Sequence, residues 1–193
     1  MNQQLAWLYV CRAARLGVIG LAIWALVACG FAATPATQES GSGGGASSPE
    51  LVAQSFFEDL GRALQDAQLS NEDKRDQWVE RLASYFAPNE RDDQRVALSS
   101  ALDNFVSGRG KLESNESLRV EVRFGKVEKI SGDDNRVLVR PTDASIYILI
   151  TRTTANGIFT LYEDNVPLSK VFGDPNGAVP VIRIGRSWFL TEG

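Results

Sequence analysis

The most constraining feature of this sequence is an uncharged apolar run near its N-terminus. Residues 16–28 read LGVIGLAIWALVA, and the residues before them carry two arginines, Arg12 and Arg15, but no acidic residue. A positively charged start, an apolar segment of this length and a small residue at its end are typical of a secretory signal peptide. We therefore predict that residues 1–28 are a leader and that the globular part lies C-terminal to them.

The end of the apolar run carries a more specific pattern. Residues 26–30 read LVACG, so Leu26 and Ala28 occupy the third and first positions before Cys29. This pattern resembles the lipobox of bacterial lipoproteins. The resemblance implies cleavage between Ala28 and Cys29, a diacylglyceryl group on the Cys29 thiol and, often, acylation of the new amine. Because two or three acyl chains hold a protein stably on a bilayer, the expected location is extracytoplasmic, lipid-anchored to the membrane of a bacterial envelope.

An uncleaved membrane helix is the alternative interpretation of the same residues. Residues 16–33 contain no charge, and eighteen helical residues span about 27 Å, near the lower limit for crossing a bilayer. In either case the positive residues precede the apolar run, so the rest of the chain is expected outside the cytoplasm.

A linker is predicted between the leader and the domain. Residues 29–49 are rich in Gly, Ser, Ala and Thr. A chain of this composition buries little apolar surface and has a mean reach of about 25 Å. We expect a single domain over residues 50–193 that is held near the membrane surface by this tether.

The composition excludes several chemistries. The chain has no histidine, which rules out a Ser-His-Asp triad and imidazole metal sites. After cleavage Cys29 would be the only cysteine, since Cys11 lies in the leader. Without the leader the chain carries 18 basic and 24 acidic residues, a net charge of −6, which disfavours nucleic acid as a partner. We predict no cofactor and no metal.

The first half of the domain is predicted to be helical. Ser48 and Pro49 are typical of a helix start, and apolar residues then recur at intervals of three and four up to Ala67. Asn71 is predicted to cap a second helix that ends at Pro88. A third helix is predicted over residues 91–107, with Gly108 as its C-terminal cap.

The second half is predicted to form strands. Residues 118–124 alternate between apolar and charged side chains, residues 145–152 are apolar on both faces and therefore predicted to be central, and Asn156-Gly157 is typical of a hairpin turn. A last strand is predicted from Val179 to Leu190, bent at Gly185, with Ile182, Ile184, Trp188 and Leu190 on one face. Three helices followed by an antiparallel meander indicate an α+β fold.

The order of elements, the domain length and the final strand, VIRIGRSWFL, resemble the nuclear transport factor 2-like superfamily. This resemblance implies three N-terminal helices packed on one curved antiparallel sheet, forming a cone with a pocket. The cystatin-like arrangement of one helix on a meander is the alternative.

Some members of that superfamily are isomerases and cyclases that use a carboxylate in the pocket as a base. The polar residues near apolar stripes are Tyr85, Tyr147, Asp103 and Asp143, but no motif places any of them in a pocket, and we assign no catalytic residue. The leading hypothesis is a non-catalytic module that binds an envelope protein or a small ligand. The alternatives are a metal-free isomerase or cyclase, and a structural subunit of an envelope complex. A homodimer is also considered, because residues 145–152 are apolar on both faces.

Overall fold

The computed structural model describes residues 45–171 and 177–192. The predicted signal peptide, the cleavage site between Ala28 and Cys29, the lipidation of Cys29 and most of the predicted linker lie outside these residues. No helix within the described ranges is both long and apolar enough to cross a bilayer.

Three helices begin the domain, as predicted. They are α2 (Pro49–Gln65), α3 (Glu72–Ala83) and α4 (Arg91–Arg109). The Ser48 hydroxyl accepts a hydrogen bond from the Leu51 amide at 3.2 Å, and the Asn71 side chain accepts one from the Lys74 amide at 3.2 Å. Both predicted N-caps are therefore confirmed. The third helix extends two residues beyond its predicted end and is capped by Gly110 rather than Gly108.

The strands form two antiparallel sheets instead of the single curved sheet that the sequence led us to expect. One sheet has the order β1-β4-β5 and consists of β1 (Glu116–Arg123), β4 (Ser145–Thr154) and β5 (Gly157–Pro167). The other has the order β2-β3-β6-β7 and consists of β2 (Val127–Gly132), β3 (Arg136–Pro141), β6 (Val179–Ile184) and β7 (Ser187–Leu190). A short helix, α5 (Leu168–Val171), follows β5. The α+β class is confirmed.

The two sheets separate where the β1–β2 and β3–β4 connections lie side by side. The Gly125 amide, between β1 and β2, donates a hydrogen bond of 2.7 Å to the carbonyl of Thr142, between β3 and β4. A Cβ atom at Gly125 would lie 2.5 Å from the Thr142 hydroxyl, so the close approach requires glycine. β2 was not among the strands predicted from the sequence.

The C-terminal segment is a hairpin, not the bent strand that was predicted. β6 and β7 turn at Gly185, whose φ is 63°, and Trp188 lies opposite Arg183. The turn changes which residues share a face, so the prediction that Trp188 lies on the same face as Ile182 and Ile184 was wrong.

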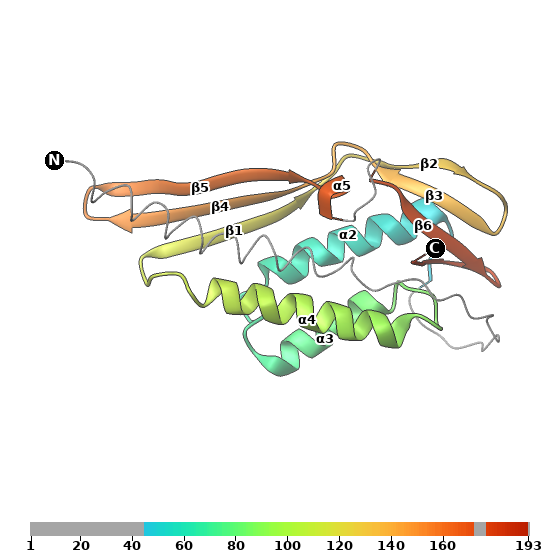
Figure 1. Cartoon of the computed structure of the whole chain (residues 1–193), viewed down its shortest axis with the longest axis horizontal. Coiled ribbons are helices and arrows are strands. Elements are labelled where there is room, and N and C mark those ends of the chain that lie inside the picture. Colours follow the sequence, from blue (N-terminus) through green and yellow to red (C-terminus); the bar gives the residue numbers. More distant parts are fainter. Residues whose placement is uncertain (1–44, 172–176, 193) are drawn as a thin grey trace.

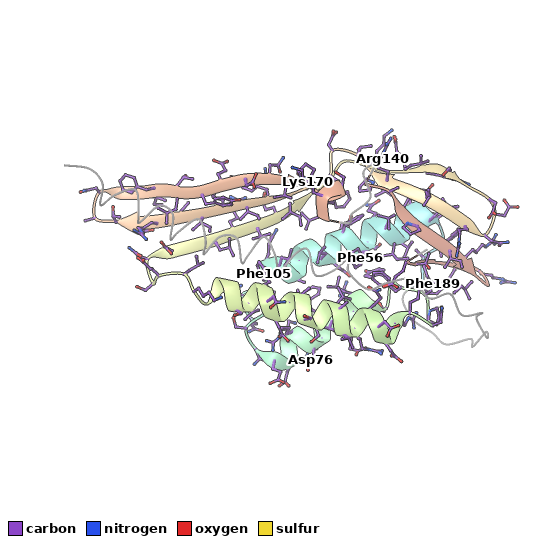
Figure 2. The ribbon with its side chains drawn as sticks, viewed as in Figure 1. Phe56, Asp76, Phe105, Arg140, Lys170 and Phe189 are labelled. Carbon is purple, nitrogen blue, oxygen red and sulfur yellow. The ribbon has the colours of Figure 1, made fainter. Side chains whose placement is uncertain are left out.

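Helix α2 lies at the centre of the molecule. It packs against β1 of the first sheet and against all four strands of the second. Figure 1 shows α3 and α4 on the side of α2 away from the strands, and in Figure 2 Phe56 and Phe105 lie between α2 and α4. The side chains with the least exposure in this core include Phe57, Leu69, Leu82, Leu190, Val139 and Val181. Their burial supplies the main driving force for folding.

The β4–β5 hairpin extends away from this core. β4 is central, as predicted, with Ile148 opposite Val120 of β1 and Asp164 of β5. The main packing partners of β5 are β4 and α5. The hairpin turn lies at the opposite end of the molecule from β6 (Figure 1).

Candidate functional site: a buried carboxylate and an exposed edge strand

A buried carboxylate, Asp59, joins α2 to α3. The Arg81 guanidinium donates to it from Nε at 2.5 Å and from Nη2 at 3.0 Å, and the Tyr85 hydroxyl donates at 2.6 Å. Arg62, one turn along α2, donates from Nη1 at 3.0 Å. The Asp59 side chain is 2% exposed, whereas those of Arg81 and Arg62 are more than half exposed. Asp59 therefore accepts from donors on two helices and fixes their relative position.

The electrostatics of this cluster oppose a role for Asp59 as a general base. Burial acts to raise the pKa of Asp59, but the hydrogen bonds from Arg81 and Tyr85 and the charges of Arg81 and Arg62 outweigh it, and the pKa is lowered. Burial, together with the hydrogen bond to Asp59 and its negative charge, raises the pKa of Tyr85 to about 12. A base acting near neutral pH needs a raised pKa, so the arrangement favours a permanent ion pair.

The other candidate residues are dispersed. Asp103 on α4 pairs with Arg75 of α3 at 2.5 Å and is half exposed. Asp143 lies in the turn before β4, with a φ of 51°. The Tyr147 hydroxyl donates to Glu163 at 2.9 Å on an exposed part of the sheet. The structure does not gather these residues around Tyr85.

Asp59 was not among the candidate residues predicted above, although the sequence contains a signal for it. Val52, Phe56, Leu60 and Ala63 define the apolar stripe of α2, and Asp59 lies within that stripe at helical spacing from Phe56 and Ala63. An acidic residue at such a position must be paired when it is buried.

The acidic segment between β2 and β3 forms a turn. The Asp133 side chain accepts hydrogen bonds from the amides of Asn135 and Arg136, both at 2.8 Å. Within the described ranges no group of three or more acidic or cysteine side chains is arranged to hold a metal ion.

The second feature is the exposed edge strand β5. Ile158 is 71% exposed, Phe159 50% and Leu161 39%. Because neighbouring side chains on a strand point to opposite faces, these residues expose apolar surface on both faces of the sheet. The strand has a register shift against β4 between Ile150 and Thr151, which leaves Leu161 without a partner residue across the pair.

The other half of β5 is acidic. Glu163 accepts a hydrogen bond from Tyr147, and Asp164 accepts one from the Tyr162 hydroxyl at 2.9 Å. Neither carboxylate forms a salt bridge with a cation of the described chain. β5 therefore presents three apolar side chains followed by two carboxylates, each of which accepts a hydrogen bond from a tyrosine, along one exposed strand.

The comparisons with known proteins give no family assignment. No protein-family model matches the chain, and no curated protein sequence matches it.

Proposed function

We propose that the chain is a cell-envelope lipoprotein whose extracytoplasmic domain binds a partner near the membrane surface without catalysing a reaction. The observation that carries this proposal is the exposed apolar half of β5. Scattered exposed apolar residues are ordinary on a protein surface, but adjacent ones along one strand are typical of interaction sites. The lowered pKa of Asp59 is consistent with a non-catalytic domain.

The proposed location depends on the N-terminal sequence. The run of residues 16–28 and the LVACG pattern support cleavage before Cys29 and acylation of its thiol. Two or more acyl chains would then keep the domain at the membrane.

Lipidation can be tested with the two cysteines of the chain. In bacteria fed a labelled fatty acid, we expect the unchanged chain to incorporate label and Cys29→Ala to lose it. Cys11→Ala is the matched control and should retain the label. Label that still enters Cys29→Ala would contradict the lipid anchor, as would a mature N-terminus other than residue 29 in mass spectrometry.

The binding role can be tested in cells with a photo-crosslinking amino acid. Position 158 on β5 and position 96 on α4 are suited to comparison because Ile158 and Val96 are 71% and 72% exposed. We expect discrete crosslinked products from position 158 and none of comparable yield from position 96. An absence of crosslinks from positions 158, 159 and 161 would overturn the binding role.

We further propose that the domain is a divided variant of the nuclear transport factor 2-like cone. Its support is the order of three helices before an antiparallel meander and the position of α2 against both sheets. An experimental structure in which α2 lies outside a curved wall formed by the strands would contradict this assignment.

A further inference from the structure

Two of the edge strands, β7 and β5, differ in what lies beside them. The outer side of β7 is paired, since Ala46 forms an antiparallel bridge with Trp188 and Phe86 a parallel bridge with Leu190. β5 ends the β1-β4-β5 sheet, and no described segment pairs with its outer side. An edge strand presents a row of backbone N–H and C=O groups that can pair with another chain.

β5 also lacks most of the features that discourage such pairing. It is eleven residues long, contains no lysine or arginine, and has proline only at its last position, Pro167. Natural edge strands are commonly short or carry lysine or an internal proline. The features of β5 that oppose pairing are the register shift at Leu161 and the charges of Glu163 and Asp164.

The side chains of β5 specify which kind of strand would fit. A strand added beside it would extend both faces of the sheet, so its apolar side chains would cover Ile158 and Phe159 on opposite faces at once. Further along, a basic side chain would lie beside Glu163 or Asp164. Opposite charges on adjacent strands stabilise pairing, whereas like charges destabilise it.

We propose that β5 accepts an extended segment of a partner protein as a fourth strand, with apolar residues along Ile158–Leu161 and a lysine or arginine beside Glu163 and Asp164. This inference rests on the proposed binding function and specifies its site and the chemistry of the partner.

A second copy that pairs along the whole length of β5 fits less well. In a two-fold antiparallel pair of β5 strands centred on Leu161, Asp164 of each copy would lie beside Ile158 of the other, and Glu163 beside Phe159. Such a pair would desolvate carboxylates against apolar side chains.

A lipid surface also fits less well. The hydrocarbon region cannot hydrogen-bond the backbone groups of an open edge, and the two carboxylates lie on the same strand as the apolar residues.

Designed peptides provide the test on the purified full chain in detergent. The probes are two fluorescein-labelled eight-residue peptides, each with two lysines in one half and valine and isoleucine in the other, in opposite orders. We expect one order to bind with a micromolar Kd by fluorescence anisotropy. Ile158→Lys should raise that Kd at least tenfold, because lysine on an edge opposes strand addition. Val96→Lys, equally exposed on α4, should change it less than twofold. If neither order binds at millimolar concentration, or both variants weaken binding equally, the proposal is wrong.

A charge exchange tests the acidic half separately. Glu163→Lys should raise the Kd of the lysine peptide at least fivefold. It should lower the Kd of a peptide that has glutamates in place of the lysines. An equal loss for both peptides would contradict the proposed charge pairing.

Hydrogen exchange distinguishes the occupants. The bound peptide should slow exchange of the amides of residues 157–164. Equal slowing on raising the protein concentration alone would assign the edge to a second copy, and slowing in lipid nanodiscs without peptide would assign it to the bilayer. Either result overturns the proposal. If neither peptide binds but photo-crosslinks still form from position 158, the proposed binding function stands and only strand addition is rejected.

Discussion

Two of the four edge strands, β7 and β5, carry similar apolar side chains in opposite surroundings. β7 carries Trp188, Phe189 and Leu190, each less than 10% exposed, whereas β5 carries Ile158, Phe159 and Leu161, each more than a third exposed. The Leu190 amide donates to the Tyr85 carbonyl, and its own carbonyl accepts from the Ala87 amide, both at 2.9 Å. An apolar edge strand can thus be part of the core or an open surface, and the difference lies in which other segments pack beside it.

The largest effect expected from this comparison is at the two phenylalanines. Phe189 is 7% exposed, and the Arg91 guanidinium lies 5.6 Å from the centre of its ring. It lies toward the end of the molecule opposite the β4–β5 turn (Figure 2). Phe189→Ala should lower the free energy of unfolding by about 3 kcal/mol, since the cavity cannot collapse fully. Phe159→Ala should cost less than about 1 kcal/mol. Urea unfolding followed by circular dichroism measures both, and equal losses would break the comparison.

The buried ion pair is expected to give the next largest effect. Asp59→Asn removes the negative charge to which Arg81, Arg62 and Tyr85 donate hydrogen bonds. It should lower the free energy of unfolding by about 2 kcal/mol. Asp103→Asn removes a half-exposed pair with Arg75 and should cost less than about 1 kcal/mol.

The pH dependence of the same variant sharpens this prediction. Because the pKa of Asp59 is lowered on folding, its contribution is present above the unfolded pKa of about 4 and is lost as the pH falls through the folded value. Asp59→Asn should therefore flatten the acid side of the stability profile. An unchanged profile would show that Asp59 contributes nothing through its charge.

The pairing of Ala46 with β7 gives a smaller effect. The Ala46 amide donates to the Trp188 carbonyl at 3.1 Å, and the Trp188 amide donates back at 2.8 Å. A Cβ atom at Gly45 would lie 2.6 Å from the Phe189 ring, so Gly45→Ala should cost about 1 kcal/mol. It should also speed hydrogen exchange at the Trp188 amide.

Gly110→Ala is the matched control for that variant. A Cβ atom there would lie at an ordinary 3.5 Å from its nearest neighbour, so stability should change by less than about 0.5 kcal/mol. Exchange at Trp188 that is unaffected by Gly45→Ala would mean that Ala46 does not protect β7.

An effect of similar size is expected at Tyr85. A tyrosine whose pKa is raised to about 12 contributes stability below its unfolded pKa of about 10, and this contribution is lost as the pH rises through the folded value. Tyr85→Phe should cost about 1 kcal/mol at neutral pH and should remove the highest-pH step from the phenolate absorbance titration. Tyr147→Phe provides a comparison at an exposed site. Loss of the same step from Tyr147→Phe would contradict the assignment.

Local sequence signals predicted much of the fold. Ser48 and Asn71 marked helix starts because their side chains satisfy amides that the helix itself leaves unpaired. Asn156-Gly157 marked a hairpin because glycine readily adopts its φ of 126°. The two-sided apolar pattern of β4 indicated a central strand, since both of its faces had to be covered.

The missed features depend on contacts between distant residues. Gly185 is compatible with a bend or a hairpin, and the pairing of Val181 with Leu190 decides between them. Asp59 could be placed on the α2 stripe from the sequence, but its partner Arg81 is 22 residues away.

The sequence by itself determined the helices, the central strand, the main turns and the absence of imidazole chemistry, because these follow from local periodicity, backbone preferences and composition. Only the tertiary structure decided that the strands divide into two sheets, that Asp59 joins two helices, and that β7 is covered while β5 is open. Those outcomes depend on which segments meet in space, and apolar side chains on two edge strands carry no local mark of which will be buried.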